Sequence, residues 1–240
     1  MKHIQQVLVL AHGWGYNHRF FNPLLQTLQS EGTLENSLVV ALECGYFPDQ
    51  ARAGVMLYTQ DGWQHHPAET LHSLVLAHAE APWIGVGHSL GTVRLLNTAV
   101  RWNCMVSING FTRLAAMQAG QAGVAPRVLV RMLNKARSNM PKVLADFHHS
   151  CGHAPTWATL DDRALLTDLE WMLNVDIDPA VRRVVAIYSP SDAIVPKSLA
   201  ESCFAQVALY TLITVDAPHG ELGKNATRYT DVLLPVLRSD

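Results

Sequence analysis

The residues best suited to chemistry lie in the stretch GHSLG, where Ser89 stands between two glycines directly after a short apolar run. The apolar run predicts a strand that ends at Val86, and the residues after it predict a helix that begins near Leu90. Gly87 and Gly91 permit the cramped turn that joins such a strand to a helix and exposes the serine hydroxyl. Backbone N–H groups at a helix N-terminus also favour a developing negative charge. The pattern therefore indicates that Ser89 is a nucleophile rather than an ordinary turn residue.

A serine nucleophile needs a base that accepts its proton and an acid that orients the base. After a strand, turn and helix of this kind, the acid and then the histidine follow on loops that come after later strands. Asp192 follows the apolar run 184–188, and His219 follows the last apolar run, 209–215. We therefore predict that Asp192 orients His219. The alternatives are that Asp192 caps a following helix, that Asp216 replaces it, and that His219 is one solvated loop residue among twelve histidines.

The oxyanion that forms when a serine attacks an ester needs at least two preorganised N–H donors. The backbone N–H of Leu90, directly after the serine, is one expected donor. The loop HGWG (12–15) after the first apolar run is a glycine-framed turn, and we expect the backbone N–H of Trp14 to be the second donor. The Trp14 indole would then form a wall of the acyl pocket. The alternative is that Trp14 is a core aromatic residue.

Short apolar runs alternate with longer amphipathic stretches, which predicts an α/β fold with a mostly parallel sheet and helices on both faces. A chain of 240 residues with 49% hydrophobic content fits one domain, 1–240. The predicted strands are 7–11, 37–42, 83–86, 104–108, 184–188 and 209–215. The predicted helices are 20–29, 67–79, 90–101, 197–205 and 225–237, with Pro67 in the first turn of the second helix and a polar loop at His65 and His66.

The section from about 115 to 173 breaks this alternation. It contains three helical segments, 127–136, 142–149 and 161–172, and no convincing strand between them. A purely helical insertion of this kind predicts a lid over one end of the sheet, where ligands enter.

Composition and charge exclude several classes of protein. A formal net charge of −2 and 16% charged residues give no sign of a nucleic-acid binder. The apolar run Val7 to Ala11 is too short for a signal peptide or a membrane span, so we expect a cytoplasmic monomer without membrane contact. Four widely spaced cysteines predict free thiols. We expect no metal and no cofactor, although His149 and His153 fall one helical turn apart.

The predicted lid carries an uneven charge. No Asp or Glu occurs between Ala81 and Ala145, and Arg127, Arg131 and Lys135 are spaced by four, so they share one helical face. The residues able to pack downward over the pocket are Leu129, Met132, Leu133 and Ala136. A cationic outer face would attract an acidic partner. The alternative is a solvated helix face that binds nothing.

The segments HGWG, GHSLG, DAIVP and PHG together resemble the α/β hydrolase superfamily over nearly the whole chain. Within it, HGWG, the charged helical lid and the modest length are most similar to the carboxylesterases that hydrolyse the methyl ester of pimeloyl attached to acyl carrier protein in biotin synthesis. The chain departs from those esterases at GHSLGT, where they usually have a tryptophan before the serine, and at Glu43 to Phe47 in the loop after a strand.

The resemblance implies that Ser89 is the nucleophile, that Asp192 orients His219, and that Trp14 and Leu90 hold the oxyanion. It further implies that the lid segment 147–151 lines the acyl channel, with Phe147 in contact with the substrate. Acyl carrier protein is an acidic partner that fits Arg127, Arg131 and Lys135. A thioesterase, an acyltransferase, a general small-ester hydrolase and a noncatalytic ligand receptor remain alternatives, whereas haloalkane or epoxide chemistry needs a carboxylate in place of the serine.

Overall fold

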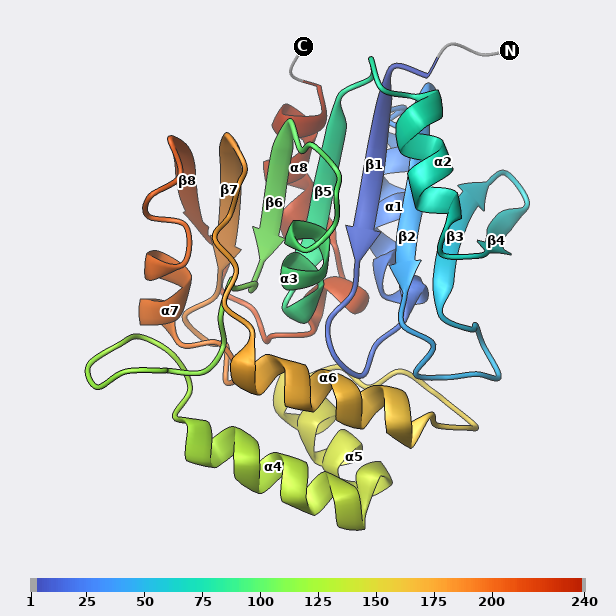
Figure 1. Cartoon of the computed structure of the whole chain (residues 1–240). Helices are drawn as coiled ribbons and strands as arrows, with labels where there is room; N and C mark the ends of the chain where they lie inside the picture. Colours follow the sequence, from blue (N-terminus) through green and yellow to red (C-terminus); the bar gives the residue numbers. More distant parts are fainter. Residues whose placement is uncertain (1–3, 239–240) are drawn as a thin grey trace.

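The computed structural model describes residues 4–238 and is built around one eight-stranded sheet (Figure 1). The strand order is β4-β3-β2-β1-β5-β6-β7-β8. The strands are β1 (Gln6–Ala11), β2 (Ser37–Glu43), β3 (Gly54–Thr59), β4 (Gly62–His66), β5 (Trp83–His88), β6 (Cys104–Ile108), β7 (Arg183–Tyr188) and β8 (Leu209–Thr214). The six strands β2-β1-β5-β6-β7-β8 are parallel to one another. At the other edge, β3 is antiparallel to both β2 and β4. The predicted α/β fold with a mostly parallel sheet is confirmed.

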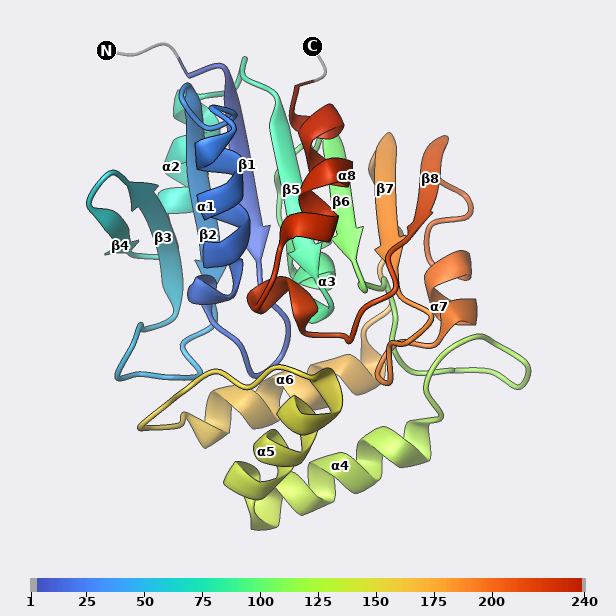
Figure 2. The same cartoon turned by 180° about the vertical axis from the view of Figure 1, so that it is seen from behind.

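Helices cover both faces of the sheet. One face carries α1 (Asn22–Ser30) and α8 (Thr227–Leu237), which stand in front of the strands in Figure 2. The opposite face carries α2 (Thr70–Ala77), α3 (Leu90–Leu96) and α7 (Lys197–Ser202) (Figure 1). Alternate residues of β1 enter the two hydrophobic cores that result, so every residue from Val7 to Ala11 is buried. Burial on both faces explains why the parallel strands are continuous apolar runs in the sequence.

Three helices between β6 and β7 lie across the carboxyl ends of the parallel strands (Figure 1). They are α4 (Pro126–Ser138), α5 (Met140–Cys151) and α6 (Asp162–Asn174), and we call them the helical block. Asn139 and Asp161 cap the starts of α5 and α6 by accepting backbone N–H bonds, and Gly152 ends α5 with φ 72°. These caps divide the insertion into separate helices close to the predicted bounds.

All six predicted strands are present, with ends displaced by no more than two residues. The hairpin of β3 and β4 is missing from the prediction, although Val55 to Tyr58 of β3 form a short apolar run. His65 and His66, expected in a loop, belong to β4, which is mostly polar. Pro67 precedes α2, which begins at Thr70, so its placement in the first turn is wrong. The end of α3 at Leu96 also corrects the predicted end at 101, since the Thr98 hydroxyl bonds to a carbonyl of the last turn.

Three further features bear on what the chain can bind. No helix within residues 4–238 is long and apolar enough to cross a membrane. The described residues contain no group of three or more His, Cys, Asp or Glu side chains placed to hold a metal ion. All four cysteines carry free thiols, and three of them are buried.

Candidate active site

Ser89 lies at a strained turn between β5 and α3. Its backbone angles, φ 54° and ψ −123°, are ones that residues other than glycine rarely adopt. The flanking glycines make this turn possible: a Cβ atom at Gly91 would lie 1.8 Å from the carbonyl oxygen of Ala11, and one at Gly87 would lie 2.5 Å from the Cα of Thr92. The sequence therefore forms the strand, turn and helix that GHSLG predicts, and the strain is held by close packing on both sides.

Asp192 and His219 form a buried pair. Oδ2 of Asp192 lies 2.6 Å from Nδ1 of His219, and the two side chains are 1% and 0% exposed. The other carboxylate oxygen accepts the backbone N–H groups of Ile194 and Val195, which fixes the carboxylate orientation. Asp192 does not cap α7, whose N-cap is Pro196. Nε2 of His219 is buried and has no hydrogen-bond partner among residues 4–238, so it is not bonded to the serine hydroxyl in this structure.

Asp216, the alternative acid, is engaged elsewhere. Its carboxylate accepts the hydroxyl of Ser191, and its backbone carbonyl accepts a hydrogen bond from Arg228. The histidine that pairs with Asp192 is therefore not shared with Asp216.

His88, the residue directly before Ser89, ties the serine turn to the loop of His219. Its Nε2–H donates to the backbone carbonyl of His219 at 2.9 Å, and the side chain of Asn109 donates to the same oxygen at 3.4 Å. Burial and the neighbouring His219 ring lower the pKa of His88 well below its usual value, so the ring is neutral. The sequence carries no indication of His88 or Asn109, because each of them contacts a residue more than a hundred positions away in the chain.

The loop HGWG runs beside the serine turn. A Cβ atom at Gly13 would lie 3.0 Å from Cβ of Ser89, which shows how closely the two backbones approach. The backbone N–H groups of Trp14 and Leu90 form no hydrogen bond with any other group in residues 4–238. The Trp14 side chain is 2% exposed, and its indole donates to the carbonyl of Leu165 in α6 at 2.9 Å. The indole thus packs as a core residue against the helical block.

Helix α5 packs against the loops of Trp14 and His219. The ring of Phe147 meets Trp14 edge-on at 5.0 Å and His219 at 6.4 Å. Nε2–H of His148 donates to the carbonyl of Gly15 at 2.7 Å, and burial lowers the pKa of His148 to about 4. Ser89 itself is only 4% exposed. Helix α5 therefore lies against two loops of the candidate site, 12–15 and the loop of His219.

The predicted channel segment 147–151 does not face inward throughout. Phe147 and His148 point toward the serine loop, but His149 and Ser150 are exposed on the outer side of α5. Helical periodicity explains the correction, because five consecutive residues of a helix cannot all lie on one face.

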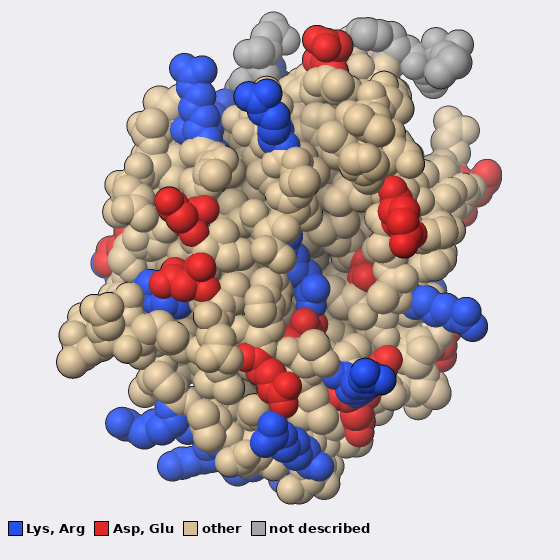
Figure 3. All heavy atoms as spheres, viewed as in Figure 1, with Lys and Arg blue, Asp and Glu red and all other residues tan. Residues whose placement is uncertain are grey.

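The outer face of α4 is basic. Arg127, Arg131 and Lys135 are exposed on it, and Lys and Arg side chains gather at this end of the molecule (Figure 3). Together with Lys142 of α5 they line a groove of about 720 Å³ that also contains Val130 and Val143. The inward face consists of the buried residues Leu129, Leu133 and Ala136 and the half-buried Met132. The predicted division of this helix into a basic and an apolar face is present.

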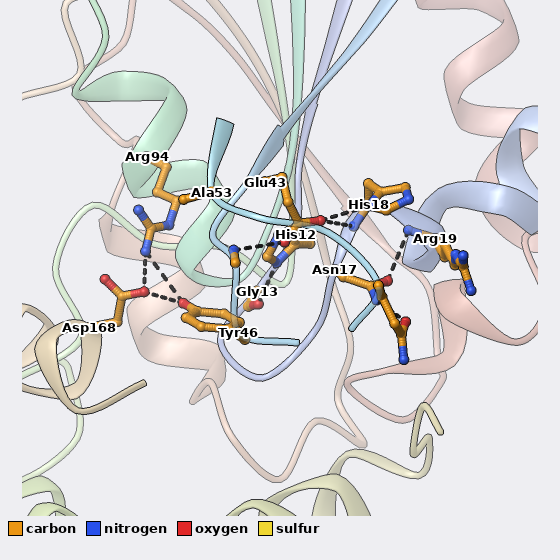
Figure 4. A network of polar contacts seen from close by, with 12 residues as sticks. His12, Gly13, Asn17, His18, Arg19, Glu43, Tyr46, Ala53, Arg94 and Asp168 are labelled. Atoms are coloured by element: carbon orange, nitrogen blue, oxygen red, sulfur yellow. Dashed lines mark hydrogen bonds and ion pairs between the residues drawn. The ribbon is translucent and has the colours of Figure 1, made fainter. Parts of the chain in front are cut away.

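Two networks of buried and half-buried polar groups are centred on Asp168 and on Glu43 (Figure 4). In one, Asp168 of α6 accepts hydrogen bonds from Arg94 of α3 and from the hydroxyl of Tyr46. Arg94 also lies 5.5 Å from the ring centre of Trp171 in α6. These contacts attach α6 to the helix that begins after Ser89. In the other network, Glu43 at the end of β2 meets His12 and His18.

Comparison with known proteins agrees with this architecture. Residues 8–223 match the alpha/beta hydrolase family, and the chain belongs to that family. A search of curated proteins found no match. Among solved structures, an esterase from Exiguobacterium antarcticum superimposes with a TM-score of 0.74 at 13% identity, over 98% of this chain and 92% of that one.

Two further structures share the fold. The enol-lactonase from Burkholderia xenovorans LB400 has a TM-score of 0.65 at 16% identity, over 98% of this chain and 92% of that one. Homoserine O-acetyltransferase from Staphylococcus aureus has a TM-score of 0.63 at 12% identity, over 99% of this chain and 86% of that one. Identities this low establish the fold alone.

Proposed function

We propose that the chain is a serine hydrolase that cleaves carboxylic esters through an acyl-enzyme. The observation that carries this proposal is the buried Asp192–His219 pair, whose free Nε2 atom belongs to a loop bonded to the serine turn. Such a histidine can accept the proton of Ser89, and the carboxylate stabilises the imidazolium that forms. A strained serine between glycines without a neighbouring base would have no comparable chemistry.

The reaction proceeds in two acyl-transfer steps. As the Ser89 oxygen attacks the ester carbon, His219 takes the hydroxyl proton and a tetrahedral oxyanion forms against the N–H groups of Trp14 and Leu90. The bond to the alcohol then breaks, and His219 returns the proton to the departing oxygen. A water molecule next loses its proton to His219 and attacks the acyl carbon, and the acid leaves as the Ser89 hydroxyl re-forms.

The helical block acts in this proposal as a lid. Ser89 is only 4% exposed, and Phe147 of α5 packs on Trp14, so we propose that the substrate enters while α5 is displaced and that Phe147 contacts the acyl chain. The basic face of Arg127, Arg131 and Lys135 would then attract an acidic carrier of the acyl group. We propose acyl carrier protein as that carrier and the methyl ester of a pimeloyl-type chain as the substrate, as in biotin synthesis.

Labelling with a fluorophosphonate probe and hydrolysis of p-nitrophenyl acetate test the catalytic proposal. We expect the wild-type protein to be labelled at Ser89, and Ser89→Ala to lose labelling and about a millionfold in kcat. Turnover by Ser89→Ala near the wild-type rate, or an unlabelled wild-type protein, would end the proposal. Labelling with transfer of the acyl group to an added alcohol or amine instead of water would identify an acyltransferase.

A charge reversal tests the carrier. The double variant Arg127→Glu, Arg131→Glu should raise KM for a carrier-linked methyl ester and leave p-nitrophenyl acetate hydrolysis unchanged. The matched control is Arg137→Glu on the same helix, since Arg137 pairs with Glu170 outside the groove. Equal losses on both substrates would refute the docking role.

A further inference from the structure

Glu43 is a carboxylate buried beside the loop that carries Trp14 (Figure 4). It accepts the ring Nδ1–H and the backbone N–H of His18 at 2.7 and 2.9 Å and the backbone N–H of Gly45 at 3.0 Å. Burial alone would raise the pKa of Glu43, but attraction to His12 and hydrogen bonds from the ring and backbone of His18 outweigh burial and lower it. Glu43 is therefore a buried anion, and such an anion needs a compensating charge nearby.

The ring of His12 faces an oxygen at each nitrogen. Nδ1 lies 3.0 Å from the carbonyl oxygen of Gly13, and Nε2 lies 3.5 Å from Oε1 of Glu43. Nε2 forms no hydrogen bond with any group in residues 4–238, so it meets Glu43 through the ion pair alone. A neutral imidazole carries only one N–H, so one ring nitrogen would point its lone pair at an oxygen. The imidazolium presents an N–H to both oxygens, whereas a neutral ring presents only one.

The other titratable groups around His12 allow the positive charge. Cys44 follows Glu43 in the chain, and the ring of Tyr46 lies edge-on to His12 at 5.8 Å. His88, on β5, is neutral, and the cation Arg94 is paired with Asp168. Burial would lower the pKa of His12, but Cys44 and Glu43 raise it well above its usual value.

The carbonyl that His12 bonds to belongs to the same peptide group as the N–H of Trp14. The Gly13 oxygen accepts Nδ1–H of His12 and, at 3.3 Å, the backbone N–H of Tyr16. A donor at a peptide carbonyl polarises the whole planar group and makes its N–H a stronger donor. The charge on His12 thus polarises the backbone N–H of Trp14, which donates to the oxyanion in the proposed mechanism.

We propose that His12 is a buried imidazolium, held by Glu43, that positions and polarises the Gly13–Trp14 peptide and so strengthens oxyanion binding. This inference rests on the proposed function, because it requires Trp14 to be an oxyanion donor. His12 and Glu43 touch no reacting atom and are positioning residues.

The pH dependence of kcat separates this role from a merely structural one. In the wild-type enzyme kcat should fall at alkaline pH as His12 loses its proton. In Glu43→Gln the carboxylate no longer opposes burial, so the pKa of His12 falls and the alkaline fall in kcat should move at least one pH unit lower. At pH 8 we expect kcat to be reduced about tenfold and KM to be unchanged. A pH profile of Glu43→Gln that superimposes on the wild type would overturn the proposal.

Two neighbouring variants serve as controls. His18→Asn removes the 2.7 Å bond to Glu43 but leaves the ion pair with His12, so the alkaline fall should stay at its wild-type pH. Cys44 also raises the pKa of His12, so Cys44→Ala should move the fall to lower pH, but by less than Glu43→Gln does, because Glu43 carries a full charge. If Cys44→Ala moves the fall and Glu43→Gln does not, the thiol rather than the carboxylate holds the charge, and the proposal is wrong.

A direct measurement keeps the proposal testable even if Glu43→Gln fails to fold. ¹⁵N NMR of the wild-type histidine rings, with His12 assigned by its absence in His12→Gln, should show both nitrogens of His12 protonated at pH 7. A neutral ring would refute the inference. If fluorophosphonate still labels Ser89 while His12 is neutral, only this inference fails, whereas an unlabelled wild-type protein removes the proposed function itself.

Discussion

Replacing Asp192 by asparagine tests the candidate site most sharply, because the structure dictates how the new side chain must sit. Oδ1 of Asp192 accepts two backbone N–H groups at 2.7 and 3.0 Å, so asparagine must place its oxygen there. Its NH₂ group then faces Nδ1 of His219. That donor forces Nδ1 to accept, and the ring proton moves to Nε2, where it blocks proton transfer from Ser89.

The expected loss is about 10⁴-fold in kcat, or roughly 5 kcal/mol of barrier, with KM nearly unchanged. Release of p-nitrophenol from p-nitrophenyl acetate measures it, and a thermal unfolding curve verifies that the variant is folded. Asp216→Asn is the matched control, since Asp216 bonds to Ser191 and not to the histidine. A folded Asp192→Asn enzyme that retains more than a tenth of wild-type kcat would refute the reasoning.

Two further predictions concern stability. Gly91→Ala should lower the melting temperature by roughly 10 °C or more, because its Cβ would lie 1.8 Å from the backbone oxygen of Ala11. Gly120→Ala, where a Cβ meets open space, should cost only about 1 kcal/mol, and equal shifts by calorimetry would contradict the packing argument. The pKa of His148 is near 4 in the fold against an ordinary 6.5, so the unfolded chain binds more protons in this window and stability falls as the pH drops from 6.5 toward 4. His148→Gln should reduce this loss of unfolding free energy between pH 6.5 and pH 4 by up to about 3 kcal/mol. If the variant loses as much unfolding free energy as the wild type over this range, His148 is not the cause.

Much of the fold follows from the sequence because parallel strands buried on both faces leave unmistakable apolar runs. The turn at Ser89 is equally local, since it needs only the glycine spacing and the strand and helix on either side. The Asp192–His219 contact spans 27 residues, yet it was predictable because loops at the carboxyl ends of neighbouring parallel strands meet at one edge of the sheet.

The supporting shell of the site could not be predicted in this way. His88 and Glu43 act on residues whose closeness depends on the finished fold, and nothing local separates a buried histidine from a solvated one. One signal was available: Glu43 ends the apolar run SLVVALE, and a carboxylate at the end of a buried strand needs specific partners. The hairpin of β3 and β4 at the sheet edge carries a weaker signal, because its apolar run, Val55 to Tyr58, is short and β4 is mostly polar.

Two helices of the helical block are fastened differently. Asp168 fixes α6 to Arg94 and Tyr46 through charged and hydroxyl groups. Helix α5 instead rests on two loops of the site through apolar packing, a hydrogen bond from His148 to the carbonyl of Gly15, and one from the backbone N–H of Gly220 to the carbonyl of Cys151. We therefore expect α6 to stay as a fixed wall while α5 swings as a flap. Chain-length preference could then be redesigned at Phe147 without loosening the scaffold that holds the reacting groups.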